Sequence, residues 1–593
     1  MNVQMRRYRL PGILVLLLLL VLSIPVVQAQ PFRTGTISLL TPDNDTIPAS
    51  RDFATEVIGD PWDMDQPTDI FFEDTRESGF RDLVVSNGFM SGITTTTDPN
   101  IWIMEPGIPG SQMLGHTGAQ YPIDATRYTR LVFRMYLSSA RPDEFLQIFW
   151  YVHGRFDGTG YGASSFLPLR AGWYIYDINL ATVGRIAGDT NWAGTIRGFR
   201  IDPLNKSIGV TVKLDWVQLI DPSTAPTYDI RWSAIGAGSE IVSLYYDTDR
   251  NGSHKQLFAT GIPATQGSYT WTPCLAPGNY YVFAQLSGGA QAASPGSLGI
   301  NHPPVVAITA PSMTSGPDYA TVEAGNPWDM NDPGDITWMY DIASYEYAGG
   351  IFNAITTGND PQLRLNTPKP IDTHKYRYYT FRMYLEGTQD IGTGWVHRVY
   401  FYNTPWEPGI LDDVVIYEGW RTYTLDLQTA SIESISRYHW TDGQWTWFRF
   451  DVDEMPSTMR FHLDYVKLTA NDEADAAFNI RWELNDPDST DVTLELYAVD
   501  GQNQRTLIGI VANGQVRRPS MTQEQVQPGE TYSYTVYLPL VMRNYCAPCD
   551  QEGNCFTWYT ANIPAGTYYI QIEAHDGYNH TEWTSETPVV IKH

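Results

Sequence analysis

The chain has 593 residues, too many for a single hydrophobic core, and it is acidic, with 38 Lys and Arg against 66 Asp and Glu for a net charge of −28. A surface of that sign repels nucleic acids and anionic membranes, so neither is expected as a partner. The same charge suits a soluble extracellular protein and attracts divalent cations.

The first 29 residues predict a secretory signal peptide. Arg6, Arg7 and Arg9 form a basic start, Ile13–Leu22 is an unbroken apolar run, and Val27–Ala29 offers small residues for cleavage. The apolar run is short for a bilayer span. The sequence therefore predicts a secreted protein, free or associated with the cell surface, with no membrane contact after cleavage.

An internal duplication organises the rest of the chain. It opens with a short acidic motif around a tryptophan, GDPWDMDQPTDI, which returns as GNPWDMNDPGDI. The repeated motifs keep their order along the chain, so a whole unit has been copied. The matched segments are 59–70 with 325–336, 122–137 with 370–385, and 214–219 with 463–468.

A smaller unit follows each copy. YDIRW (Tyr228–Trp232) is matched by FNIRW (Phe478–Trp482), and the second small unit holds an insertion at about residues 516–555. A Gly/Ala/Ser/Pro-rich linker joins the two halves. The expected units are A at 31–222, B at 223–300, A′ at 303–470 and B′ at 471–593.

Hydrophobic alternation predicts strands throughout. In YTRLVFRMYL the apolar Leu131, Phe133, Met135 and Leu137 share one face, which is the pattern of a strand with one side in a core. Helical periodicity is absent beyond the signal peptide, and 49 Gly and 39 Pro punctuate short aromatic and β-branched runs. We therefore expect an all-β fold, with A and A′ as jelly-roll sandwiches and B and B′ as immunoglobulin-like sandwiches.

The closing strands LDWVQL and LDYVKL, together with the size of the units, make A and A′ resemble carbohydrate-binding modules of the galactose-binding-like jelly-roll group. The patterns LYYDTD, SYTW and APGNYYV make B and B′ similar to fibronectin type III or immunoglobulin-like modules of bacterial surface proteins and secreted glycosidases, and to the sandwich module of cell-wall-synthesis proteins. These resemblances imply architecture more firmly than ligand.

Asp215 and Asp464 are the candidate metal ligands. Each is expected to share a strand face with apolar residues, where a carboxylate needs a cation or several donors. The resemblance implies a structural Ca²⁺, because the closing-strand aspartate of such modules helps to hold that ion. The alternative is an ion pair with Arg200 and Arg449, respectively.

Aromatic side chains on strands give the strongest binding signal. Sugars stack on aromatic faces and hydrogen-bond to Arg, Asn and Asp. Ordinary sandwich packing is the competing interpretation. The candidate ligand-binding residues are Tyr128, Arg134, Tyr136, Trp150, Tyr151, Tyr376, Arg382, Tyr384, Tyr402 and Trp406.

The four cysteines, Cys274, Cys546, Cys549 and Cys555, are disulfide candidates in a secreted chain. The segment CAPCDQEGNC predicts at least one local bridge, although three pairings are formally open. A zinc knuckle is the alternative, with Cys274 as a fourth ligand from another unit.

The repeated PWDM motif is interpreted as a structural corner. Pro fixes φ, Trp and Met plug an edge, and Asp caps a turn. Asp63, Asp65 and Asp69 recur with Asn331 in the middle position, so strict carboxylate chemistry is disfavoured, while a ligand role stays open as the alternative.

The chain lacks HExxH, GxSxG and a Gly-rich phosphate loop, and its histidines are scattered. The expected function is therefore non-catalytic, with no cofactor beyond the structural Ca²⁺ and with a polysaccharide or cell-wall glycan as partner. A structural or adhesive wall or matrix protein with protein partners is the alternative, and a glycoside hydrolase or lyase is the third.

Overall fold

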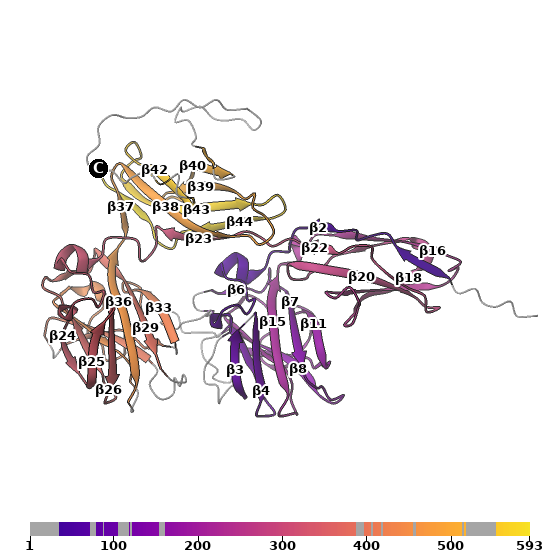
Figure 1. Cartoon of the computed structure of the whole chain (residues 1–593), viewed down its shortest axis with the longest axis horizontal. Helices are drawn as coiled ribbons and strands as arrows, with labels where there is room; N and C mark the ends of the chain where they lie inside the picture. Colours follow the sequence, from indigo (N-terminus) through magenta and orange to yellow (C-terminus); the bar gives the residue numbers. More distant parts are fainter. Residues whose placement is uncertain are drawn as a thin grey trace, which may run out of the picture.

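The computed structural model describes residues 35–70, 79–86, 88–104, 118, 121–152, 160–386, 396–404, 407–416, 419–454, 458–512, 515–517, 549 and 553–593. Within these ranges the chain is built almost entirely of strands, and its helices are single turns (Figure 1). The predicted all-β class is confirmed. None of the helical turns in the described ranges is long and apolar enough to cross a bilayer.

Two facing sheets enclose the core of the A unit. Leu131, Phe133, Met135 and Leu137 all point into this core and are at most 1% exposed, as their alternation predicts. The five-stranded sheet has the order β11 (Gly172–Asn179), β7 (Arg130–Leu137), β15 (Thr211–Ile220), β4 (Phe89–Thr94) and β3 (Phe80–Ser86). The other sheet has the order β12 (Arg185–Gly188), β9 (Tyr161–Ser164), β8 (Phe145–Tyr151), β14 (Gly198–Asp202) and β5 (Ile101–Met104), with β10 (Leu167–Pro168) on β8 and a separate ribbon of β6 (Ile123–Asp124) and β13 (Thr195–Ile196).

The A′ unit repeats this architecture strand for strand around its closing strand. Its five-stranded sheet has the order β25 (Ile342–Ala348), β26 (Ile351–Thr356), β36 (Arg460–Ala470), β29 (Tyr376–Leu385) and β33 (Gly419–Asp426). The other sheet has the order β24 (Ile336–Tyr340), β27 (Gln362–Leu365), β35 (Trp447–Asp451), β30 (Val396–Tyr402) and β31 (Gly409–Ile410), with β32 (Val414–Val415) on β30 and a ribbon of β28 (Ile371–Asp372) and β34 (Gln444–Trp445).

The B and B′ units have smaller cores, and each pairs a three-stranded sheet with a larger one. In B the orders are β1 (Thr36–Leu39), β16 (Tyr228–Ile235), β19 (Ser268–Trp271), and β18 (Gln256–Pro263), β17 (Ile241–Asp247), β20 (Gly278–Leu286), β22 (Leu298–Ile300), β2 (Asp45–Ile47), with β21 (Gln291–Ala293) on β20. In B′ they are β23 (Val305–Ala310), β38 (Ala477–Asn485), β42 (Cys555–Tyr559), and β37 (Asp472–Ala474), β45 (Val589–Ile591), β43 (Gly566–His575), β39 (Thr493–Val499), β40 (Arg505–Ala512), β41 (Gln515–Arg517), with β44 (His580–Thr584) on β43.

Each A-type unit is inserted into its B-type unit. Strand β1 pairs with β16 and β2 with β22, so residues 36–47 belong to B and not to A. Strand β23 likewise pairs with β38 of B′. The expected starts of the A units at residues 31 and 303 are therefore wrong. The physical reason is that a short strand joins whichever sheet buries its apolar face, and Ile37 and Leu39 are buried in the B core.

The contact between A and B is apolar, and the same positions are polar in A′. Val132, Ile175 and Ile220 lie on the outer face of the five-stranded sheet and pack into the B core. Register places Thr380, Thr422 and Thr469 at the corresponding positions of A′. The two units therefore differ where A meets its small neighbour.

Helical turns mark the corners of the units. The π-helical turns are η1 (Ala54–Ile58) and η5 (Ala320–Ala324), and the 3-10 turns are η2 (Pro67–Asp69), η3 (Pro222–Thr224), η4 (Ala264–Gln266), η6 (Pro333–Asp335) and η8 (Trp440–Asp442). Turns η1 and η2 flank the PWDM motif of A, and η5 and η6 flank that of A′. Trp62 and Trp328 are each 1% exposed, in agreement with a plugged corner.

Candidate functional site

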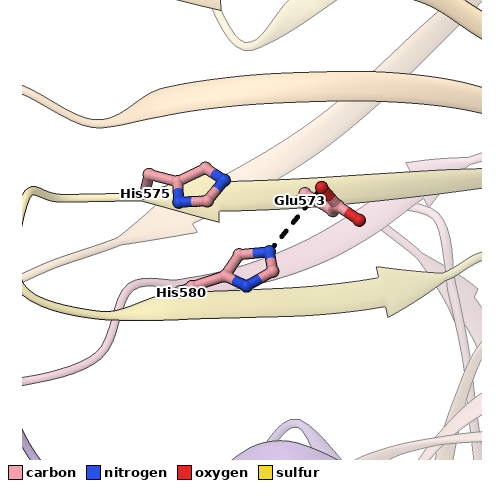
Figure 2. Close-up of side chains that lie close together, drawn as sticks. All are labelled: Glu573, His575 and His580. Carbon is pink, nitrogen blue, oxygen red and sulfur yellow. Dashed lines mark ion pairs between the residues drawn. The ribbon is translucent and has the colours of Figure 1, made fainter. Parts of the chain in front are cut away.

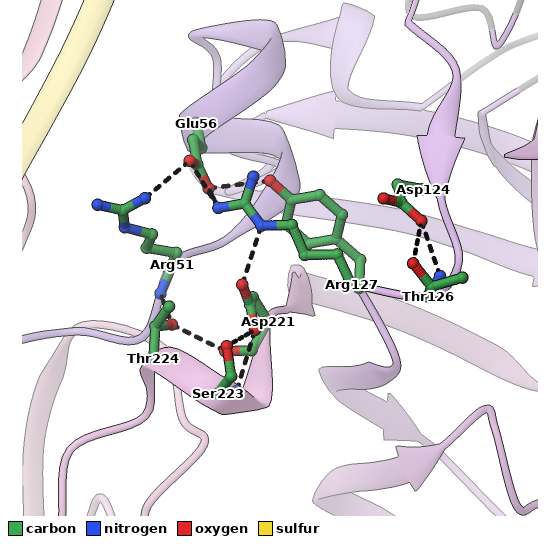
Figure 3. A network of polar contacts seen from close by, with 9 residues as sticks. Arg51, Glu56, Asp124, Thr126, Arg127, Asp221, Ser223 and Thr224 are labelled. Atoms are coloured by element: carbon green, nitrogen blue, oxygen red, sulfur yellow. Dashed lines mark hydrogen bonds and ion pairs between the residues drawn. The ribbon is translucent and has the colours of Figure 1, made fainter. Parts of the chain in front are cut away.

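Tyr128 and Tyr376 are structural, which corrects their expected place on a binding face. They are 2% and 1% exposed, and the Tyr128 hydroxyl donates to Glu56 at 2.9 Å. Figure 3 shows Arg127 reaching the same carboxylate at 2.7 Å and Asp221 at 2.9 Å. Tyr376 donates to Glu323 at 3.2 Å in the second copy. Both tyrosines lie where regular alternation fails, since Tyr128 precedes β7 and a register shift follows Tyr376.

The next strand also divides the predicted residues. Trp150 is 1% exposed in the A core, and its indole donates to the Thr190 carbonyl at 3.2 Å. Tyr151 and Tyr402 lie on the outer face of the second sheet but are only 3% and 8% exposed, because neighbouring rings cover them. Trp406 lies outside the described residues.

Arg134 and Tyr136 do lie together on the outer face of the five-stranded sheet of A. Trp173, on the adjacent strand β11, completes a cluster with them: the Arg134 guanidinium is 4.4 Å from the indole centroid, and the Tyr136 ring is 5.5 Å from it. Arg134 also donates to Asp215 on β15 at 2.5 Å. Three neighbouring strands thus place a cation, a carboxylate and two rings side by side.

The A′ unit builds the same cluster on the corresponding strands. The Arg382 guanidinium lies 4.5 Å from the Trp420 centroid, Tyr384 is 5.7 Å from that ring, and Arg382 donates to Asp464. His462 adds a ring 5.2 Å from Tyr384. We call these two groups the A cluster (Arg134, Tyr136, Trp173, Asp215) and the A′ cluster (Arg382, Tyr384, Trp420, Asp464).

The two aspartates face outward, which corrects their predicted position among apolar residues. A β-bulge lies at each of them, since the pairing skips from Leu214 to Trp216 on β15 and passes over Asp464 on β36. The extra residue turns the carboxylate to the arginine-bearing face. Burial raises the pKa of Asp215, and Arg134 offsets part of that shift.

The ion-pair alternative for these aspartates is right in kind but wrong in partner. Arg134 and Arg382 bind them, whereas Arg200 pairs with Asp202 at 3.0 Å and Arg449 pairs with Asp451. Arg200 and Arg449 lie on the other sheet, on β14 and β35, so they cannot reach the closing-strand carboxylates. An arginine side chain therefore already pairs with each carboxylate that was expected to bind Ca²⁺.

The two clusters differ in access. The side chains of Arg382 and Asp464 are 39% and 28% exposed, and Trp420 is 37% exposed. Arg134 and Asp215 are only 25% and 18% exposed. The B unit lies beside the A cluster and leaves a hollow of about 20 Å³ between them. The chemistry is common to both: ring faces for apolar C–H surfaces, with guanidinium donors and carboxylate acceptors at their edge.

Trp173 and Trp420 are the residues that sequence reasoning missed. The signal available in the sequence was the Gly-Trp dipeptide that occurs in both units, at 172–173 and 419–420. Trp102 and Trp447 were also missed, on the outer face of the second sheets beside Tyr151 and Tyr402.

A larger cavity of about 420 Å³ lies between the η1 turn and the B′ hairpin of β43 and β44. Arg51 and Glu56 line one side, and His580 and Trp583 line the other. The Ala49 amide donates to the Asn579 side chain across this junction at 3.0 Å. The cavity lies between A and B′, whereas each of the two A-type units carries one of the clusters, so we favour the repeated clusters as the functional site.

Cys549 and Cys555 form a disulfide, which links the start of β42 to the segment before it. Cys274 is a buried free thiol, and burial raises its pKa. Cys546 lies outside the described residues.

Three groups of side chains in the described part of the chain have the spacing of metal ligands. In the first, shown in Figure 2, Glu573, His575 and His580 lie on the β43–β44 hairpin with the two imidazoles stacked 4.2 Å apart. Glu573 is already paired with Arg505. In the second, Asp412, Asp413 and Glu433, the last two carboxylates bind Arg398. The third is the PWDM turn of A, with Asp63, Asp65 and Asp69.

The sequence matches no protein-family model, and no match to it is found among curated proteins. The structure shows an all-β protein in which two sandwiches with the same order of strands around the closing strand carry the same cation–aromatic cluster.

Proposed function

We propose that this is a secreted, non-catalytic protein that binds polysaccharide through the A and A′ clusters. The B and B′ units act as spacers in this account. The resemblance of the A units to carbohydrate-binding modules supports the proposal, as does the signal peptide.

The observation that supports it best is the recurrence of the cluster across two copies that have diverged around it. Arg over Trp, Tyr beside Trp and Asp bound to Arg recur within 0.2 Å in the two ring distances, 4.4 and 5.5 Å against 4.5 and 5.7 Å. Neighbouring positions changed from Val132 to Thr380 and from Lys213 to His462. Retention of four interacting residues amid such change favours a shared ligand.

The chemistry of the cluster fits a sugar. The apolar C–H face of a pyranose stacks on indole and phenol rings, and its hydroxyls hydrogen-bond to guanidinium and carboxylate groups. Two such sites on one chain raise the apparent affinity for a polymer, since the second contact becomes intramolecular.

A panel of soluble and insoluble polysaccharides tests the proposal. The mature chain should be retained by at least one glycan, and the double variant Tyr136→Ala/Tyr384→Ala should lose that retention. Tyr578→Ala, which truncates a 53% exposed tyrosine of B′, serves as the control and should bind like wild type. Absence of binding to every glycan, together with self-assembly at micromolar concentration, would favour the structural alternative with protein partners.

A further inference from the structure

The PWDM turn of the A unit gathers three acidic side chains. Ligand oxygens of Asp63, Asp65 and Asp69 lie within 4.8 Å of one another. No Arg, Lys or His of the described residues forms an ion pair with any of these three. Three carboxylates at this spacing repel one another unless a cation lies between them.

Asp69 adds a second and independent observation. It is 0% exposed, and among the described residues its Oδ1 has no hydrogen-bond partner, while its Oδ2 accepts a long 3.5 Å contact from the Gln66 backbone amide. A buried carboxylate oxygen with no donor is costly, and such groups are normally paired or bound to a metal. The orphaned oxygen belongs to the residue that closes the acidic group.

The corresponding turn in A′ also holds a buried aspartate with one unsatisfied oxygen. Asp335 is also 0% exposed, and its Oδ2 has no hydrogen-bond partner among the described residues, while its Oδ1 accepts from the Asn326 side-chain amide at 2.6 Å. The Asn331 amide donates to Asp329 at 3.2 Å, as the Asp65 amide donates to Asp63. The arrangement therefore survives duplication, which a random surface cluster has no reason to do.

The backbone of both turns is anchored on the closing strand of its unit. Trp62 and Met64 are at most 1% exposed, and the Trp62 carbonyl accepts from Val217 of the closing strand at 2.9 Å. Trp328 makes the same bond to Val466 at 2.8 Å. A set of hard oxygen donors on an anchored turn matches Ca²⁺, which takes carboxylate, amide and carbonyl ligands with flexible geometry.

We infer that the turn formed by Asp63, Asp65 and Asp69 is a calcium-binding site and that the turn formed by Asp329, Asn331 and Asp335 is a weaker copy. The copy is weaker because Asn331 replaces one carboxylate, and ligand charge sets Ca²⁺ affinity. Neither site uses Asp215 or Asp464. The inference is independent of polysaccharide binding and would stand if that proposal failed.

Calcium titration of the chelator-treated full chain by calorimetry tests the inference. Terbium luminescence gives a second readout, because Trp62 and Trp328 directly precede the first ligand of each turn and can sensitise a bound lanthanide. Wild type should show one tighter and one weaker Ca²⁺ site. Asp69→Asn should abolish the tighter site, and Asp335→Asn the weaker one.

Asn331→Asp is the decisive gain-of-function variant, since it gives Asp329 and Asp335 the third carboxylate that Asp65 supplies between Asp63 and Asp69. It should strengthen the weaker site about tenfold, and Asp65→Asn should weaken the tighter site by a similar factor. Asp412→Asn removes an acid from the group around Arg398 and should change nothing. Circular dichroism without metal should show every variant folded. The inference is overturned if wild type binds no Ca²⁺, or if Asp69→Asn/Asp335→Asn binds Ca²⁺ and sensitises terbium as wild type does.

Discussion

The Arg382 guanidinium lies over the Trp420 indole, 4.5 Å from its centroid, while the same guanidinium donates to Asp464. The carboxylate fixes the cation in one position, and the cation extends the aromatic surface with hydrogen-bond donors. Arg134 stands in the same relation to Trp173 and Asp215. This pairing of stacking surface and polar edge is the basis of the proposed sugar site.

Replacing this arginine with lysine separates charge from shape. Arg382→Lys keeps the positive charge beside Asp464 but loses the planar donor surface, so we expect about tenfold weaker glycan binding by the A′ cluster. The stability of the fold should change by less than about 1 kcal/mol, because the ion pair is partly exposed. Affinity electrophoresis in a gel that contains the glycan measures the binding. The matched control is Arg460→Lys, at an exposed ion pair with Glu386 near the end of the same sheet. Equal losses in both variants would contradict a specific role for Arg382.

The apolar contact between A and B gives a second prediction. Val132→Thr places a hydroxyl among the apolar side chains of the B core, where it has to give up hydrogen bonds to water. We expect it to lower the free energy of unfolding by about 1–3 kcal/mol. Thr380→Val, at the corresponding position of A′, loses only a 3.1 Å hydroxyl contact with Thr424 and should have a smaller effect. Calorimetric unfolding of the full chain compares the two. A larger loss in Thr380→Val would show that the A–B contact is not the source of the difference.

A buried histidine makes A′ sensitive to acid. His397 is 0% exposed and lies between the Tyr379 hydroxyl and the Asp451 carbonyl, and burial lowers its pKa to about 3. An unfolded chain binds a proton there at the ordinary histidine pKa, while the folded chain stays neutral. The contribution to stability is thus present above about pH 6.5 and is lost as the pH falls toward 3, at up to ~1.4 kcal/mol per pH unit.

The A unit supplies the control for this prediction, because register places Leu146 at the position of His397. The double variant Tyr379→Phe/His397→Leu removes both polar partners and should flatten the stability profile of A′ between pH 6.5 and 4. Urea unfolding at several pH values measures it. An unchanged acid dependence in the double variant would assign the effect to other groups.

The sequence predicts the regular parts of this fold better than its irregular ones. Alternation identifies the core face of β7, and the repeat identifies Trp62 and Trp328 as corner plugs, because packing obeys a period that can be read from one strand. The bulge at Asp215 adds one residue to the strand, so the carboxylate faces the side opposite to the one that strict alternation predicts. Strand β1 pairs across a whole inserted unit, so its partner depends on tertiary structure.

Of the candidate site, the sequence identifies Arg134, Tyr136, Arg382 and Tyr384 as outward-facing and leaves out the two tryptophans between them. Trp173 and Trp420 come from strands that start just after a loop, where few residues define a period. In the sequence, Tyr128 and Trp150 cannot be told apart from exposed aromatic residues. Only the packed structure shows that the Tyr128 hydroxyl bonds to Glu56 and that the core encloses both rings.

The thiols give a chemical prediction. Cys274 is 3% exposed with a raised pKa, so iodoacetamide at pH 8 should not label it in the native protein and should label it after unfolding in urea. Cys549 and Cys555 should require a reductant before labelling, because they form a disulfide. Peptide mapping by mass spectrometry distinguishes the sites. Native labelling of Cys274 would mean that the B core opens readily.

Calorimetric titration is the sharpest test of the proposed sugar sites. A polysaccharide that retains the wild-type protein is titrated into four forms of the mature chain. The forms are wild type, Trp173→Ala, Trp420→Ala and the double variant. We expect each single variant to keep one site and to lose the avidity of two, with the larger loss in Trp420→Ala because the A′ cluster is more exposed, and we expect the double variant not to bind. Wild-type affinity in the double variant, with its fold intact, would contradict the account.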